Sequence, residues 1–270
     1  MLGALLLLAA ALAQVSLVDF QGDPAQGEIL AGLGGCASCH TLDDDEVPYG
    51  GGYAVVTDFG TFYGSNLTPH PEHGLGRWTF TDFARAMLYG RSPAGHAYWP
   101  AFPYPSFTGM DERDLAHLWA YLQTLEPVDR ADRAHDVGGR WRLPFWRMLA
   151  FRQGPRPTPD DPVLRRGSYL VNHVGHCGEC HTPRTGIGRL RWRKHSLEGT
   201  DEGPHPGPSL TEGLSDWDDD DLDTFLVLGM EPDGDFAGGG MGSIVSEGTA
   251  KLTPEDRAAM IAWIRYVSER

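Results

Sequence analysis

The chain has 270 residues, and its 37 Asp and Glu residues outnumber 22 Lys and Arg residues, giving a net charge of -15. Such an acidic chain has no net positive field to attract phosphates, which argues against nucleic acid as a partner. Hydrophobic residues make up 41% of the chain, which is enough for a buried core, and the length predicts one or two domains. Four cysteines are too few for a disulfide scaffold in a chain of this length.

Residues 1–18 have no charged side chain and begin with an almost wholly apolar run. This pattern is typical of a signal peptide, and Ala11-Leu12-Ala13 resembles a cleavage site. The alternative is an uncleaved membrane anchor, although a spanning helix needs about 20 apolar residues. Both interpretations predict that the rest of the chain lies outside the cytoplasm.

The two halves of the chain repeat one another. The string CASCHT at 36–41 has its counterpart in CGECHT at 177–182, and a tryptophan follows at a similar distance in each half. Each half then ends in a stretch with the pattern of an amphipathic helix, at 111–125 and at 254–267. In the second stretch, Thr253 is the expected N-cap and Pro254 the first helical residue.

The repeat predicts an all-α fold with long ordered loops, built as two tandem domains of one kind. The domains span residues 22–126 and 163–270, with a linker at 127–162. Aromatic residues in the linker are expected to pack between the domains, with a membrane-surface role as the alternative. These residues are Trp141, Phe145, Trp146 and Phe151.

All four cysteines fall in two Cys-x-x-Cys-His motifs. This motif is the attachment signal for haem c. Two thiols three residues apart on one helical turn can form thioethers with the two vinyl groups of one haem, and the adjacent histidine then reaches the iron from the same side. The sequence therefore predicts two covalently attached haem c groups. Their attachment residues are Cys36, Cys39 and His40 for the first, and Cys177, Cys180 and His181 for the second.

Two other uses of these cysteines fit the sequence less well. A structural zinc site needs four ligands, so a single ion would have to join the two motifs. A thioredoxin-like redox motif belongs beside a βαβ unit, and no such pattern is present. The spacing therefore favours haem.

Each iron either takes a second axial ligand or stays open to a substrate. A methionine thioether closes the site and raises the reduction potential. Met241 lies in a glycine-rich string at 238–242, where the backbone can approach a haem face, and is the predicted distal ligand of the second haem. Met110 is the best single candidate for the first haem.

Alignment of the two halves leaves that first distal ligand open. The position equivalent to Met241 falls near residues 99–102, where no methionine occurs, while Met110 aligns with Leu252 just before the last helix. Met110 therefore also fits an apolar contact with the first helical turn. The alternatives are a five-coordinate iron or a histidine ligand, from among His70, His73 and His96.

The chain resembles the dihaem cytochrome c family and is similar to the cytochrome subunits of periplasmic alcohol and sugar-acid dehydrogenases. The resemblance runs from about Gly22 to the C-terminus. It is carried by both haem motifs and by the strings FGTFY at 59–63, YWPAFPYPSF at 98–107 and EPDGDF at 231–236.

The resemblance implies two all-helical cytochrome c domains with His/Met irons. It supports His40 and His181 as proximal ligands and Met241 as a distal ligand. Relatives carry the first distal methionine either where this chain has Phe102 or where it has Met110.

Two functions are compatible with these features. The first is a periplasmic electron carrier, free or anchored by its N-terminus, between a dehydrogenase or quinol-linked donor and a downstream cytochrome or oxidase. The alternative is a catalytic dihaem cytochrome, peroxidase-like or thiosulfate-oxidising, with an unusual first haem. The acidity of the chain predicts a partner with a basic docking face.

Overall fold

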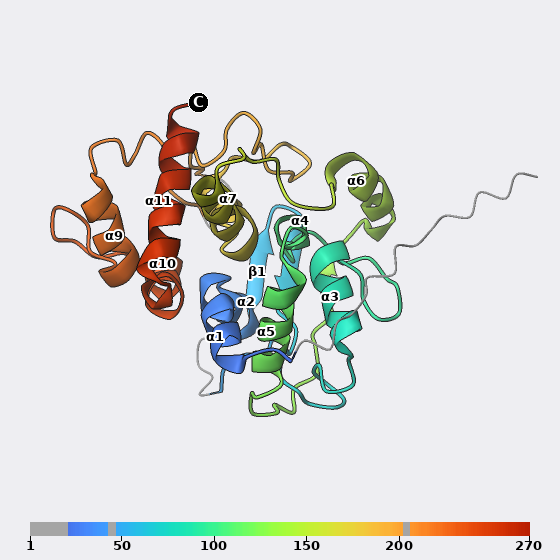
Figure 1. Ribbon diagram of the computed structural model, residues 1–270. Coiled ribbons are helices and arrows are strands. Elements are labelled where there is room, and N and C mark those ends of the chain that lie inside the picture. The colour runs from blue at the N-terminus through green and yellow to red at the C-terminus, as the bar shows by residue number, and fades with distance from the viewer. Residues whose placement is uncertain (1–20, 43–46, 202–205) are drawn as a thin grey trace, which may run out of the picture.

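The computed structural model describes residues 21–42, 47–201 and 206–270. Helices dominate, and the two halves of the chain pack against each other (Figure 1). The predicted signal peptide or anchor at 1–18 lies outside the described residues. Among the helices that are described, none combines the length and apolar character needed to cross a bilayer.

The first half begins with a helix that leads directly into the first Cys-x-x-Cys-His motif. Asp23 caps this helix by accepting a hydrogen bond from the backbone of Ala25, and Pro24 occupies its first position. The motif itself forms the next short helix. The helices of this half are α1 (Pro24–Leu33), α2 (Cys36–His40), α3 (Phe80–Tyr89), α4 (Tyr104–Phe107) and α5 (Glu112–Leu122).

The fold is mostly helical, as expected, but a small antiparallel sheet departs from a purely all-α architecture. Strands β1 (Ala54–Thr57) and β2 (Gly60–Tyr63) form a hairpin, and β3 (Asp136–Val137) pairs with β2. The hairpin is rich in Val, Thr and aromatic residues, which favour strands. Its turn is closed by Thr57, whose hydroxyl donates to the carbonyl of Gly60 over 2.8 Å.

The second half repeats the order of helices in the first. Its last helix has the predicted cap, because the Thr253 side chain accepts from the backbone of Asp256 and Pro254 is the first helical residue. The elements of this half are α7 (Pro162–Tyr169), η2 (Leu170–Val174), α8 (Gly178–His181), α9 (Asp219–Leu228), α10 (Gly239–Glu247), η3 (Thr249–Lys251) and α11 (Pro254–Ser268).

The first and last helices of each half cross at a glycine. A Cβ built on Gly27 of α1 would lie 2.0 Å from the carbonyl oxygen of His117 in α5. A Cβ on Gly167 of α7 would lie 1.9 Å from the carbonyl oxygen of Ala259 in α11. Only glycine permits the two backbones to approach so closely, so each crossing is fixed by one residue.

The second half carries one extra residue between this crossing and its haem motif. Cys36 follows Gly27 by nine positions, whereas Cys177 follows Gly167 by ten. The structure accommodates the extra residue as a turn of π-helix, η2, in which the Gly175 amide donates to the carbonyl of Leu170 over 2.7 Å. A π turn widens the helix locally without changing its direction. All five residues of η2 are buried.

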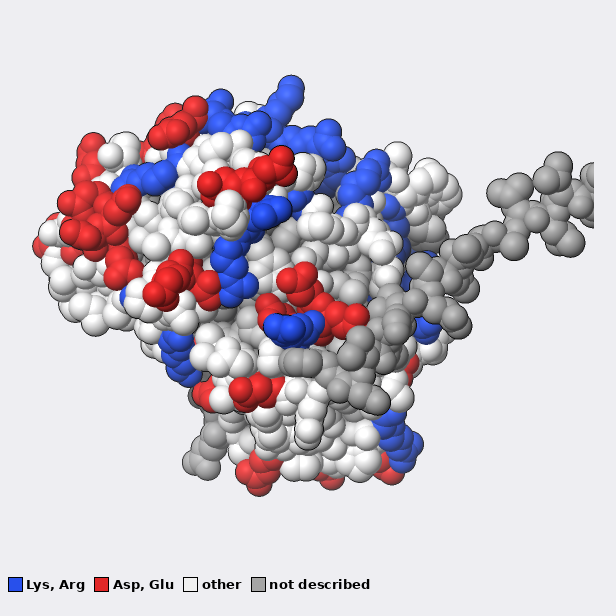
Figure 2. Space-filling view, in the orientation of Figure 1, with Lys and Arg blue, Asp and Glu red and all other residues white. Residues whose placement is uncertain are grey.

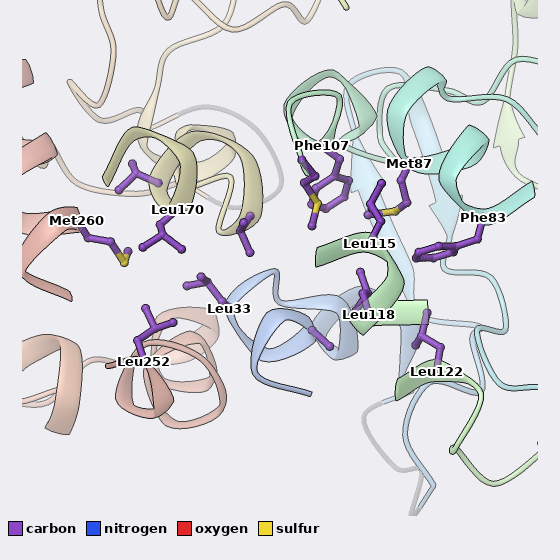
Figure 3. Close-up of a cluster of buried hydrophobic side chains, with 14 of the residues drawn as sticks. Leu33, Phe83, Met87, Phe107, Leu115, Leu118, Leu122, Leu170, Leu252 and Met260 are labelled. Atoms are coloured by element: carbon purple, nitrogen blue, oxygen red, sulfur yellow. The ribbon is translucent and has the colours of Figure 1, made fainter. Parts of the chain in front are cut away.

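One hydrophobic cluster spans both halves. Leu33, at the end of α1, lies beside Leu170 and Leu252 of the second half, while Leu115 and Leu118 of α5 continue the cluster on its other side (Figure 3). The cysteines Cys36 and Cys177 pack against the same cluster. The core therefore joins the two haem motifs.

The linker is ordered and contains β3, the turn η1 (Arg140–Arg142) and the helix α6 (Leu143–Ala150). Phe151 packs edge-on against Tyr104, with ring centroids 5.1 Å apart. Trp141 and Phe145 are 69% and 59% exposed, so the expectation that they pack between domains is wrong. Both side chains extend from η1 and α6 away from the core.

Candidate functional site

Each motif histidine is held by one hydrogen bond to a loop that follows it. His40 Nδ1 donates to the carbonyl of Ser65 over 2.7 Å, and His181 Nδ1 donates to the carbonyl of Pro208 over 2.8 Å. With Nδ1 protonated, the lone pair of each neutral ring is on Nε2. A histidine that ligates a metal is commonly fixed in this way by its second nitrogen.

The loops that hold these histidines also repeat. The carbonyl of His40 accepts from the Gly51 amide, and that of His181 accepts from the Gly199 amide, both over 2.8 Å. Two residues before these glycines, Tyr49 and Leu197 have φ angles of 67° and 61°. A positive φ in a large non-glycine residue is strained, and here the same strain occurs at the same place in both halves.

Glycine is required where each loop passes the motif. A Cβ on Gly64 would lie 1.7 Å from the carbonyl oxygen of Cys39, and one on Gly207 would lie 2.8 Å from Nδ1 of His181. Each glycine directly precedes the residue whose carbonyl holds the histidine. Loop and motif are therefore packed as one unit in both halves.

The four thiols are uncharged near neutral pH. Burial is the main cause, and it raises the pKa of the Cys36 and Cys177 thiols to about 12 and of the Cys180 thiol to about 11. The pKa of Cys39 is raised in the same direction. All four cysteines are free, so each remains available for a thioether bond.

The two motifs are neighbours in space. His176 Nε2 donates to the carbonyl of Gly34 over 2.9 Å. His176 directly precedes the second motif, and Gly34 lies two residues before the first. Gly35 and His176, which each precede a first cysteine, both have positive φ angles of 56° and 36°. Charge on Cys39 also contributes to raising the pKa of Cys180.

A buried polar network ties the second motif to the first half. Glu179, between the two cysteines, accepts from the Ser106 hydroxyl over 2.7 Å and pairs with Arg184. Burial opposes ionisation of Glu179, but Arg184, His176 and Ser106 outweigh it and lower the pKa of the carboxyl. A charged group is thus held inside the interface between the halves.

Ser106 is also contacted by His173 of η2. His173 is 2% exposed, donates from Nδ1 to the carbonyl of Ser106 over 2.7 Å, and accepts at Nε2 from the backbone of Arg156 over 3.1 Å. Its ring lies against Gly109, where a Cβ would be only 2.3 Å from it. His173, Ser106 and Glu179 were not predicted from the sequence as site residues.

These residues fit haem c. Each half offers two neutral thiols on one helical turn, a histidine whose Nε2 lone pair is free of its own hydrogen bond, and a close-packed loop that keeps the ring in place. Among the described residues, no group of three or more His, Cys, Asp or Glu side chains is placed to hold a metal ion by itself.

Known proteins match the chain along most of its length. A family model described as cytochrome c matches residues 25–126. The "Diheme cytochrome c-type" protein of Cereibacter sphaeroides is 41% identical over 262 residues, which cover 91% of this chain and 86% of that protein. The chain belongs to the dihaem cytochrome c family. The resemblance found in the sequence is thereby confirmed, and electron transfer by haem c is the activity that this family membership implies.

Other relatives of this cytochrome are parts of dehydrogenases. The cytochrome c subunit of a quinone alcohol dehydrogenase from Gluconacetobacter polyoxogenes is 37% identical over 89% of the chain. The gluconate 2-dehydrogenase cytochrome c subunit of Pantoea cypripedii is 32% identical over 94% of it. The chain spans only 55% and 62% of the length of these two relatives.

The candidate distal methionines of the cytochrome lie in different surroundings. Met241 is in the first turn of α10 and is half-buried, and its glycine neighbours Gly238 and Gly240 have open space around them. Met110 is 6% exposed and lies directly before the N-cap of α5, inside the main hydrophobic cluster. Leu252 occupies the equivalent place before α11.

The histidines proposed as alternatives to Met110 have other partners. His70 and His73 stack on each other with ring centroids 5.3 Å apart, and both face Asp129 at 3.7 and 3.6 Å. His96 is exposed and lines a surface pocket with Arg91 and Arg140.

Proposed function

We propose that the chain is a periplasmic electron carrier with two haem c groups, one in each of two cytochrome c domains at 22–126 and 163–270. Haem c iron accepts and releases one electron by changing between its ferric and ferrous states. Cys36, Cys39 and His40 hold the first group, and Cys177, Cys180 and His181 hold the second. Met241 is the distal ligand of the second, and Met110 that of the first.

The observation that carries this proposal is the double occurrence of one histidine geometry. The contacts of His40 with Ser65 and of His181 with Pro208 are the same, and so are the strained residues and glycines around them. Because the two motifs also pack against each other, electrons have only a short distance to cross between them. This arrangement suits a carrier and requires no substrate pocket.

The number of haem groups can be measured on the denatured chain. We expect c-type absorption bands to remain after denaturation, at two haems per chain. The double variant Cys177→Ala/Cys180→Ala should retain one, as should Cys36→Ala/Cys39→Ala. Loss of all haem on denaturation of the unmodified protein would refute covalent attachment and with it the carrier model.

The distal ligand of the first haem can be tested with a matched pair of variants. Met110→Ala should remove the methionine-to-iron band of one haem in the oxidised protein and lower one reduction potential, because a thioether stabilises ferrous iron. Leu252→Ala, at the equivalent place in the second half, should leave both distal ligands unchanged. An unaltered Met110→Ala spectrum would exclude Met110, and carbon monoxide binding to the unmodified protein would then favour the catalytic alternative.

The donor we propose is a periplasmic dehydrogenase, because relatives are named as cytochrome subunits of alcohol and gluconate dehydrogenases. The acceptor is a downstream cytochrome or oxidase. Mixing the oxidised protein with the catalytic subunit of such a dehydrogenase and its substrate should reduce both haems. No reduction by alcohol, gluconate or quinol-linked donors would contradict this assignment.

A further inference from the structure

The positive charge of this acidic protein is concentrated on one face. The stretches 140–156 and 184–194 contain ten of the 22 Lys and Arg residues and no Asp or Glu. They are adjacent, because Trp146 Nε1 donates to the carbonyl of Ile187 over 2.8 Å. Lys and Arg side chains gather along the upper edge of the molecule between α7 and α6 (Figure 2).

Apolar side chains project from the same face. Trp141, Phe145, Met148 and Leu149 are between 57% and 69% exposed. Their spacing of four, seven and eight residues from Trp141 places them on one side of the η1–α6 segment. Ile187, in the adjoining loop, is 49% exposed. We call residues 140–152 and 184–194 the basic apolar face.

An arginine pocket opens at the base of α6. It has a volume of about 400 Å³, and Arg91, His96, Arg140 and Arg147 line it. Arg91, Arg140 and Arg147 donate to the backbone carbonyls of Gly95, Ala97 and Tyr89. Among the described residues, none of these three guanidinium groups forms an ion pair with a carboxylate. Within the described parts of the chain, the pocket is therefore a cluster of positive charge with no carboxylate paired to it.

We propose that the basic apolar face docks on an anionic phospholipid bilayer, with a phosphate headgroup in the arginine pocket. Aromatic and aliphatic side chains on one side of a short helix, flanked by arginines, suit insertion at the boundary of headgroups and acyl chains. Anionic lipids attract the positive charge of the basic apolar face, whereas they repel the rest of the protein surface, which is acidic. Guanidinium groups match phosphate oxygens in geometry. This docking is independent of residues 1–18 and of the haem ligands.

Vesicle binding by the full-length holoprotein tests the proposal. Binding to vesicles of mixed phosphatidylglycerol and phosphatidylcholine should exceed binding to pure phosphatidylcholine and should weaken with salt. Arg91→Gln/Arg140→Gln should reduce the affinity about 30-fold, since each basic residue near an anionic surface contributes about fivefold. Trp141→Ser/Phe145→Ser should reduce it by at least tenfold. Hydrogen exchange in residues 140–152 should slow when vesicles are added.

Matched controls separate this face from other modes of attachment. Leu228→Ser/Phe236→Ser removes two equally exposed apolar side chains elsewhere, and Arg77→Gln/Arg270→Gln removes two exposed arginines outside the face. Both controls should bind as the unmodified protein does. Equal binding by all variants, or binding without preference for phosphatidylglycerol, would overturn the proposal. The proposal would also be overturned if Trp141→Ser/Phe145→Ser lost electron transfer to the same extent with and without vesicles, because the face would then be a docking site for a protein.

Discussion

His173 shows how one side chain couples the two halves. It is enclosed by η2, α4 and the backbone of Arg156, and both ring nitrogens are used in hydrogen bonds as a neutral imidazole. Burial lowers the pKa of His173 to about 4; the Ser106 carbonyl opposes this shift, and Arg156 adds to it. Protonation would remove the acceptor that the Arg156 amide uses and would place a charge in the interface.

A pH dependence of stability follows from this depressed pKa. Between about pH 4 and the ordinary histidine value of about 6.5, the unfolded chain binds a proton at His173 and the folded chain does not. The contribution of this residue is therefore complete above that range and decreases as the pH falls, by roughly 3 kcal/mol in all.

Denaturant unfolding at a series of pH values checks the His173 prediction. His173→Gln can keep both hydrogen bonds and does not titrate, so its free energy of unfolding should decline less steeply between about pH 6.5 and about pH 4. All other histidines are common to both proteins, and the difference isolates His173. Equal slopes for the two proteins would contradict the prediction.

At the scale of elements, each pair of crossing helices depends on one glycine. Gly167→Ala should lower the free energy of unfolding by about 3 kcal/mol, because the new methyl group would meet the backbone of α11 rather than a side chain that can move. Gly138→Ala is the control, since no atom lies within 4 Å of the Cβ position of this glycine, which is outside both haem motifs and the string around Met241. The control should be unchanged or up to about 1 kcal/mol more stable. Urea unfolding curves would measure both, and similar losses in the two variants would argue against the crossing as the cause.

The sequence predicts the elements that local patterns mark. The caps at Thr253 and Pro254 are confirmed, and the expected final helices at 111–125 and 254–267 correspond to α5 and α11 with shorter or shifted ends. The hairpin of β1 and β2 is local and its residues favour strands, so that part of the sheet could have been predicted. The pairing of β3 with β2 could not, because it spans more than 70 residues of chain and β3 is only two residues long. The exposure of Trp141 could not be predicted either, because the apolar character of a side chain does not show whether its helix faces the core or the solvent.

The candidate site could be predicted from the sequence only in part, because some of its contacts join segments that are far apart in the chain. The two motifs and the loops that follow them can be matched within the sequence. The residue before each Asn-Leu-Thr or Ser-Leu-Thr string could have been noticed as a shared position, and it supplies the carbonyl that holds the histidine. The contacts of Ser106 with Glu179 and His173 join one half to the other rather than lying within each half, so the repeat gives no signal for them.

At the scale of the molecule, the shared core makes the two halves one stability unit. Leu33, Leu170 and Leu252 belong to a single cluster, and Tyr169 of α7 donates to Asp114 of α5 over 2.6 Å. We expect one cooperative unfolding transition, with far-ultraviolet circular dichroism and haem absorbance changing together. Gly27→Ala and Gly167→Ala should lower the same transition. Two separate transitions, each sensitive to one variant, would show instead that the halves unfold independently.

The π turn before the second motif has a consequence for how such a chain can diverge. Because the extra residue is accommodated as a π turn, Gly167 still packs against α11 and Cys177 still lies in the same short turn as His181. The added length therefore changes neither the helix crossing nor the geometry of the haem motif. After a gene segment is duplicated, its copies can therefore gain or lose a residue at this junction without losing their cofactor. An alignment of the two halves therefore needs a one-residue gap within residues 170–174. Without that gap, equivalent residues on one side of η2 would be aligned with the wrong partners, and their shared contacts would be missed.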